Sequence, residues 1–255
     1  MILLIDIGNT NTVIGVMKHH VLDKSWRIET VKHKTEDEYL VLIRGLFDLE
    51  GLDPSQIQDS IVSSVVPELN KPYRTMLRKL CGSEPLFLGP GVKSGMPILL
   101  DNPKEVGADR IANGVAAYDK YKSACLVIDF GTATTFDVVS GKGQYLGGAI
   151  CPGPRMSVEA LGRMTSKLHV VEIEKPVNVI GKNTTDSIKS GIFYGYLSKI
   201  EGLIRRISEE LGEEPKVIAT GGLAEMFALS TDLIQAVDKD LTLKGLKIIY
   251  DRNRK

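Results

Sequence analysis

The chain has 255 residues and balances 32 basic against 32 acidic side chains, so it lacks the charge excess typical of bulk nucleic-acid binding. Three cysteines far apart exclude a disulfide framework and favour a reducing cytoplasm, and no apolar run reaches the roughly 20 residues that span a bilayer. The composition therefore predicts a cytoplasmic globular protein with no membrane or nucleic-acid partner, long enough for two core-bearing lobes of about 120 residues each.

Residues 1–12 predict a buried strand that ends in an acidic turn. The aliphatic start favours a strand, and Asp6 is followed by Gly8, which lets backbone approach a ligand closely. Residues 13–17 then predict the return strand of a hairpin. The turn residues whose side chains can join backbone N–H groups around an anion are Asn9, Thr10 and Thr12. Taken alone, the same pattern is equally typical of an ordinary turn that tolerates positive φ.

Two strands and two helices are expected next. Val21–Val31 alternates polar and apolar residues, as a half-exposed strand does. Thr35 and Glu38 predict a capping box at the start of a helix that Gly51 ends. The remaining elements of this stretch are a strand over 60–66 and a basic amphipathic helix over 69–80.

Residues 84–121 contain a loop and a helix candidate. Gly89–Ser94 superficially resembles a P-loop, but its spacing is wrong and no helix obviously follows, so we reject that interpretation. Pro103–Tyr121 predicts a helix whose alanine-rich stretch allows close packing. Its first turns contain Gly107, Asp109 and Arg110.

The opening pattern returns at a constant offset of 123 residues. The aligned pairs are Asp6 with Asp129, Gly8 with Gly131, and Thr12 with Thr135. The repeat predicts two related lobes, residues 1–122 and 123–255, whose turns face each other across a cleft. Two carboxylates converging on a phosphate chain would repel it unless a divalent cation lay between them, so the duplication predicts a metal–nucleotide site.

The second half repeats the plan of the first, with strands expected over 124–139 and 145–150 and a helix near 156–161. Thr184 or Thr185 predicts the cap of a long helix that runs to about Leu211, and its apolar stripe is typical of a core or a dimer seam. The four histidines lie away from the acidic turns and predict surface roles. They are residues 19, 20, 33 and 169.

The paired acidic turns resemble the phosphate motifs of the acetate kinase, sugar kinase, Hsp70 and actin superfamily, and Thr220–Ala224 resembles its adenosine motif. Within that superfamily, four segments occur in the order and spacing of type III pantothenate kinases. They are Asp6–Thr12, Gly107–Arg110, Asp129–Thr135 and Gly181–Thr184. The resemblance implies an α/β fold of two actin-like (ribonuclease H-like) lobes, each a mixed β-sheet flanked by helices, with a cleft between them.

The resemblance also implies an enzyme that transfers the γ-phosphate of ATP to the primary hydroxyl of pantothenate, the first step of coenzyme A biosynthesis. It implies a homodimer that uses magnesium with ATP and a monovalent cation, K⁺ or NH₄⁺. Asp109 is the expected general base, because the family's Gly-x-Asp-Arg aspartate accepts the proton of that hydroxyl. The neighbouring Arg110 favours the ionised carboxylate, although Asp-Arg in isolation is more often a surface ion pair.

The other expected site residues follow from the same resemblance. Those expected to bind ATP are Asp6, Ile7, Gly8, Asn9, Thr10, Asn11, Thr12, Val13 and Thr132. Those expected to bind pantothenate, beside Asp109, are Leu100, Gly107, Ala108, Arg110 and Thr184. Asp6 is expected to hold magnesium, directly or through water. Asp129 is either a second magnesium anchor or, as we favour, the monovalent-cation site.

Two of these positions carry a qualification. Leu100 stands where the family often has a tyrosine, and a leucine can line the apolar side of the substrate's dimethyl group. Thr184 has a helix cap as its alternative role. Two other functions remain open from the residues themselves: a superfamily phosphatase acting on nucleotide or polyphosphate, and a non-enzymatic nucleotide-binding regulator. No basic excess or helix-turn-helix pattern supports direct DNA contact.

Overall fold

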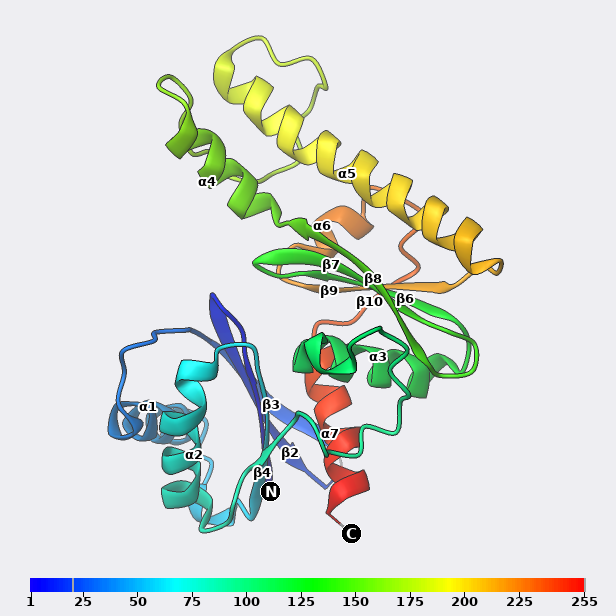
Figure 1. The fold of residues 1–255 in the computed structure, drawn as a ribbon. Helices are drawn as coiled ribbons and strands as arrows, with labels where there is room; N and C mark the ends of the chain where they lie inside the picture. Colours follow the sequence, from blue (N-terminus) through cyan, green and yellow to red (C-terminus); the bar gives the residue numbers. More distant parts are fainter. Residues whose placement is uncertain (20, 255) are drawn as a thin grey trace. The chain divides into compact units, whose positions relative to one another are not determined.

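Figure 1 shows the protein as a computed structural model, which describes residues 1–19 and 21–254. The chain forms two compact units, each with its own sheet and helices. Unit 1 contains Met1–Met96, Asp101–Ala116 and Leu241–Lys255, and unit 2 contains Pro97–Leu100 and Ala117–Asp240. Within the described ranges, no helix has the length and apolar character that a membrane crossing requires.

Each unit has a five-stranded mixed sheet, and the two sheets share one topology. The order is β3-β2-β1-β4-β5 in unit 1 and β8-β7-β6-β9-β10 in unit 2. In both, the central strand pairs antiparallel with the second strand and parallel with the fourth. The strands are β1 (Ile2–Ile7), β2 (Asn11–Lys18), β3 (Val21–Glu29), β4 (Asp59–Ser64), β5 (Leu86–Phe87), β6 (Cys125–Phe130), β7 (Ala133–Val139), β8 (Tyr145–Pro152), β9 (Lys216–Gly221) and β10 (Ala236–Val237). The shared topology confirms the two related α/β lobes.

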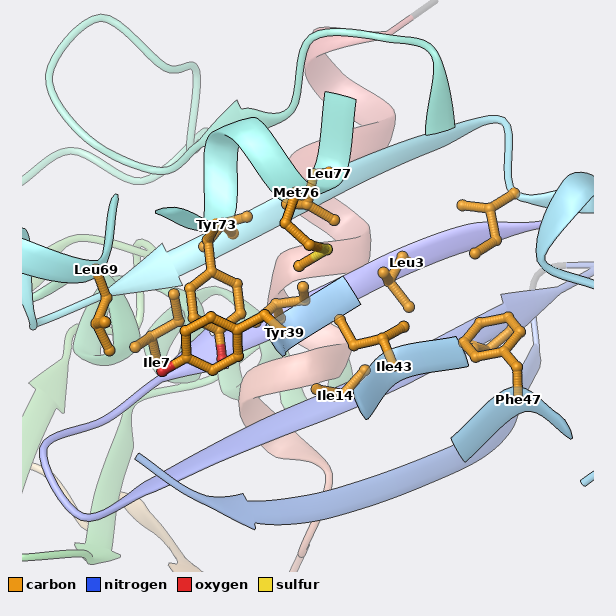
Figure 2. Close-up of a cluster of buried hydrophobic side chains, with 14 of the residues drawn as sticks. Leu3, Ile7, Ile14, Tyr39, Ile43, Phe47, Leu69, Tyr73, Met76 and Leu77 are labelled. Carbon is orange, nitrogen blue, oxygen red and sulfur yellow. The ribbon is translucent and has the colours of Figure 1, made fainter. Parts of the chain in front are cut away.

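In unit 1, α1 (Glu36–Leu49) and α2 (Pro67–Cys81) pack on one face of the sheet. Figure 2 shows the core between them, where the rings of Tyr39 and Tyr73 lie 4.4 Å apart. The predicted capping box at the start of α1 is confirmed: Glu38 N–H donates to Thr35 Oγ1, and Thr35 N–H donates to Glu38 Oε2 at 2.8 Å. Local sequence therefore determines where this helix begins.

The last helix, α7 (Leu241–Asn253), belongs to unit 1 although the chain reaches it after all of unit 2. It packs on β1 and β4, and its Leu243 side chain lies against Gly15 of β2. The lobes predicted from the sequence, residues 1–122 and 123–255, would place this helix in the second lobe. The contacts of Leu243 instead place it on the sheet that contains Asp6.

The sequence predicted one helix over Pro103–Tyr121, and this prediction is wrong. The structure has a 3₁₀ turn followed by α3 (Ala108–Tyr121). Asn102 caps the short turn Pro103–Glu105, and Val106 then adopts an extended backbone, with φ −72° and ψ 131°. The chain therefore bends just before Gly107, and Asp109 lies in the first turn of a new helix.

Unit 2 has three helices: α4 (Pro154–Met164), α5 (Thr184–Leu211) and α6 (Ala224–Ala228). Residues of α5 and α6 pack on one face of the sheet, and α4 packs against α5. The cap of α5 is Asn183, whose side chain accepts a 2.9 Å hydrogen bond from Asp186 N–H. The predicted cap at Thr184 or Thr185 is therefore wrong, because Thr184 is already helical and asparagine is as good an N-cap as any residue. His19, His33 and His169 are exposed, as predicted, whereas residue 20 lies outside the described residues.

Candidate active site

The first acidic turn joins β1 to β2 in unit 1. Asp6 is half-buried and pairs with Val13 across the hairpin, and the exposed tip consists of Asn9 and Thr10. Gly8 N–H donates to the carbonyl oxygen of Asn11 at 3.1 Å and closes the turn. A Cβ atom on Gly8 would lie 2.9 Å from that oxygen, so the turn needs a glycine.

Thr12 braces this turn from inside. Its side chain is fully buried, and its hydroxyl lies 2.9 Å from that of Thr30. Thr30 N–H also donates to the carbonyl oxygen of Thr10 at 2.9 Å. Burial raises the pKa of the neighbouring Tyr73 phenol, which therefore stays neutral. The hydroxyl of Thr12 thus supports the turn, while Thr10 presents its side chain to solvent.

Asp109 lies in the first turn of α3, where its Oδ1 accepts a 2.8 Å hydrogen bond from Arg110 N–H. A Cβ atom on Gly107 would overlap that carboxylate oxygen and would lie 3.5 Å from Val65 Cγ1. Val65 N–H in turn donates to the carbonyl oxygen of Ile7 at 3.0 Å. Unit 1 therefore joins the end of β1, next to Asp6, to the segment that contains Asp109.

The second acidic turn, in unit 2, joins β6 to β7. Asp129 pairs with Thr135 on one side and with Thr220 on the other. A Cβ atom on Gly221, where φ is +90°, would lie 2.7 Å from Asp129 Oδ1. The glycine therefore leaves room around the carboxylate, and the exposed Thr132 lies at the tip of the turn.

The segment that resembles an adenosine motif lies beside this second turn. Thr220 is buried at the end of β9, directly opposite Asp129. Gly222 N–H donates to the carbonyl oxygen of Phe130 at 3.2 Å. Unit 2 thus brings Thr220–Ala224 and the Asp129 turn together at one edge of its sheet.

Oxygen ligands at both turns suit hard cations. Among the described residues, no group of three or more His, Cys, Asp or Glu side chains forms a metal cage. A cation at Asp6 or Asp129 would therefore complete its coordination with phosphate oxygens, backbone, hydroxyls or water, which is how magnesium usually binds beside a nucleotide. The room that Gly221 leaves around Asp129 fits such a role.

Leu100 follows a short segment that pairs with β8. Tyr145 N–H donates to the carbonyl oxygen of Pro97 at 2.9 Å, and Leu99 N–H donates to that of Tyr145 at 2.8 Å. The Leu100 side chain then reaches Gly147, since a Cβ atom there would lie 3.2 Å from Leu100 Cδ2. Because Gly147 has no side chain, it leaves room for Leu100. Its φ of +118° is also a backbone conformation that favours glycine.

Thr184 is exposed at the first position of α5. It lies in an open groove of about 620 Å³. The polar residues that line this groove with Thr184 are Lys182, Asn183 and Ser187, and the apolar ones include Leu161, Leu168, Ile188 and Ile192. Thr184 and Leu100 belong to unit 2, whereas Gly107–Arg110 belongs to unit 1.

Sequence reasoning passed over Asp137, which is fully buried in β7. Its two carboxylate oxygens accept hydrogen bonds from Tyr145 and Thr135. The sequence signal for Asp137 was its place between Phe136 and Val138 in an apolar strand. Buried carboxylates are rare unless they are paired, so this position indicated a residue with buried hydrogen-bond partners.

Comparison with known proteins gives one consistent family. Residues 2–206 match the family described as Type III pantothenate kinase. A type III pantothenate kinase from Anaeromyxobacter dehalogenans (strain 2CP-C) is 51% identical over 254 residues, which cover 100% of each chain.

Two solved structures resemble the chain in fold. One, from Campylobacter jejuni, is provisionally assigned to the Baf family of transcriptional activators; it has a TM-score of 0.63, 21% identity and 98% coverage of both chains. The other, (R)-2-hydroxyglutaryl-CoA dehydratase component A from Acidaminococcus fermentans, has a TM-score of 0.56, 12% identity and coverage of 99% and 98%. At these identities the likeness concerns the fold alone, and it agrees with the actin-like class expected from the sequence.

Proposed function

This chain belongs to the type III pantothenate kinase family, and from that premise we propose which of its residues carry out the reaction. The family phosphorylates pantothenate with ATP and a divalent cation, as a step of coenzyme A biosynthesis. Family membership therefore favours a kinase over the phosphatase and the regulator that the residues alone left open. The likeness to a Baf family structure does not alter this, because it concerns the fold.

Asp109 is the general base that accepts the proton of the pantothenate hydroxyl. The observation that carries this role is the contact between Gly107 and Val65, because it joins the first turn of α3 to the end of β1. The base and the Asp6 turn thus lie near one another in unit 1. Phosphoryl transfer depends mainly on such positioning and on stabilisation of the developing charge.

The Asp6 turn binds the phosphates of ATP. Its exposed tip offers the polar side chains of Asn9 and Thr10, and its backbone offers N–H groups to an anion. Asp6 holds magnesium, directly or through water, and the cation offsets phosphate charge when bound. The other ATP contacts are Ile7, Gly8, Asn11, Thr12, Val13 and Thr132.

Asp129 holds a monovalent cation, K⁺ or NH₄⁺. The support is that Gly221 and Gly131 leave room around the Asp129 carboxylate, and that no group of three or more His, Cys, Asp or Glu side chains occurs among the described residues; a cation of low charge needs fewer acidic ligands. The expected outcome is that activity in sodium alone is low and rises with potassium, and that Asp129→Ala abolishes this dependence. Equal turnover in both salts would contradict the role.

Five residues besides Asp109 are proposed to bind pantothenate, and the support for each lies in its own surroundings. Arg110 pairs with the substrate's carboxylate, since a guanidinium binds such a group through two parallel hydrogen bonds. Gly107 and Ala108 contribute backbone contacts at the same place. Leu100 contributes an apolar contact, and Thr184 a hydroxyl from its groove.

The protein acts as a cytoplasmic homodimer. The support is a series of exposed apolar side chains in the segment that leads from the end of α4 to the start of α5, which a second copy would cover. They are Met164, Val170, Val177, Val179 and Ile180. Sedimentation at micromolar concentration is expected to give twice the chain mass, and a monomer would overturn this assembly.

The decisive experiment replaces the base. Asp109→Asn is expected to keep the fold and to reduce kcat by about 10²–10⁴-fold, because general-base catalysis contributes that much. Asp101→Asn is the matched control, since Asp101 is an exposed carboxylate nearby in sequence. ADP release is followed with and without pantothenate. Unchanged turnover in Asp109→Asn would remove Asp109 from the mechanism. A rate of ADP release that is the same with and without pantothenate would contradict the pantothenate kinase activity.

A further inference from the structure

The helix that carries Asp109 packs against the last helix of the chain. α7 lies beyond residues 2–206, which match the family, and it belongs to unit 1 with the start of α3. Its contact with α3 occurs at Gly245, which is buried.

At the crossing, backbone meets backbone. A Cβ atom on Gly245 would overlap the carbonyl oxygen of Ala112 and would lie 2.5 Å from its carbonyl carbon and 2.9 Å from its Cα. Backbone atoms cannot rotate away as a side chain can, so any larger residue at 245 must push α3 and α7 apart. Ala112 is three residues after Asp109, which is less than one helical turn.

Two further contacts fix α7 between α3 and the sheet. Thr242 Oγ1 donates a 2.7 Å hydrogen bond to Oδ1 of Asn113, whose side chain is fully buried. On the side that faces the sheet, Leu243 fills the space above Gly15, where a Cβ atom would lie 2.7 Å from Leu243 Cδ1. A shift of the helix toward the sheet would therefore press the Leu243 side chain against β2.

We propose that Gly245 is a positioning residue for the reaction: by letting α7 touch the backbone of α3, it sets where Asp109 stands relative to the Asp6 turn. The inference rests on the proposed role of Asp109 as the base. A general base acts only within hydrogen-bond reach of its proton, so a small outward displacement of α3 lowers the rate of transfer. ATP contacts made by the turn itself are unaffected.

The test is Gly245→Ala, with Gly45→Ala as the matched control. Gly45 is an exposed helical glycine of α1 with open space where its Cβ would lie. Gly245→Ala is expected to reduce kcat by about 10–100-fold, as a displacement of about 1 Å does, while KM for ATP changes less than about 3-fold. Gly45→Ala is expected to leave both constants unchanged.

A merely structural role would lower activity only as folded protein is lost. Phe47→Leu, which loosens the core on the opposite face of the sheet, therefore serves as the stability-matched control. Its Tm is expected to fall while its kcat per folded molecule stays within twofold. If Gly245→Ala behaves in the same way, the positioning role is overturned.

Thr242→Val provides a second variant in case Gly245→Ala does not fold. It keeps the shape of the side chain and removes the hydrogen bond to Asn113, and a kcat loss of about 3–10-fold at constant KM for ATP is expected. An unchanged kcat would overturn the inference. Asp109→Asn measured in parallel separates the two ideas: if it loses transfer while both α7 variants keep it, only the positioning role fails, whereas if it keeps transfer the proposed base fails.

Discussion

The phenol hydroxyl of Tyr145 donates a 2.7 Å hydrogen bond to Oδ1 of Asp137, and both side chains are fully buried. Thr135 Oγ1 donates to the other carboxylate oxygen at 2.8 Å. The main chain of Tyr145 pairs with Pro97 and Leu99. A buried carboxylate thus fixes a tyrosine whose backbone holds the segment that leads to Leu100.

Tyr145→Phe is expected to lower the free energy of unfolding by about 1–3 kcal/mol, because it removes one donor from the buried carboxylate of Asp137. Tyr118→Phe is the control, since that hydroxyl lies 3.5 Å from the carbonyl oxygen of Gly141 and is partly exposed. A change below about 0.5 kcal/mol is expected there. Urea unfolding measures the free energy of unfolding of both variants. Equal decreases in the two variants would show that the hydrogen bond to Asp137 does not stabilise the fold more than an exposed one does.

Thr184→Ala separates the two roles considered for this residue. Because Asn183 caps α5, Thr184→Ala is expected to change stability little and to raise KM for pantothenate several-fold. Asn183→Ala is expected to cost about 1 kcal/mol of stability through loss of the cap. Thermal unfolding and steady-state kinetics give the comparison. If Thr184→Ala leaves KM for pantothenate unchanged, the substrate contact is absent.

Gly147→Val tests the space that Leu100 occupies. A side chain at 147 would meet Leu100 and would strain a backbone with φ +118°. KM for pantothenate is expected to rise more than KM for ATP, because the displaced residue belongs to the substrate side. Leu100→Ala in the Gly147→Val background is expected to restore part of the loss. No restoration would indicate that backbone strain alone causes the defect.

One buried and one half-buried thiol predict lower stability at alkaline pH. Burial raises the pKa of Cys81 and of Cys125 from the usual 9.0 to about 11. Between these values the folded chain keeps protons that the unfolded chain releases, so the free energy of unfolding falls as pH rises. Tm is expected to decrease between about pH 9 and pH 11, and less steeply in a variant with alanine at both positions. Parallel curves would contradict this origin.

Features set by local sequence were predictable. The capping box of Thr35 and Glu38 depends on residues three apart, and the structure confirms it. The repeat that relates Asp6 to Asp129 predicts two sheets of one topology, because each copy opens the same series of strands. The roles of the site residues themselves remain predictions that the kinetic experiments decide.

Features set by contacts between distant segments were not predictable. Nothing in residues 241–253 indicates which sheet they cover, and the fit of Leu243 over Gly15 appears only in the fold. The inward direction of the Thr12 hydroxyl likewise depends on Thr30, which lies just after the end of β3. Alternation along a strand gives two faces, but it does not say which face a neighbour will cover.

The return of α7 to unit 1 has a consequence for biosynthesis. As the polypeptide leaves the ribosome, residues 117–240 are complete before the first residue of α7 has been made. Unit 2 can therefore fold on the nascent chain while one face of the other sheet, which includes Leu4, still lacks its cover. Until residues 241–253 have been made, this apolar face stays uncovered on the nascent chain, a state that favours chaperone binding.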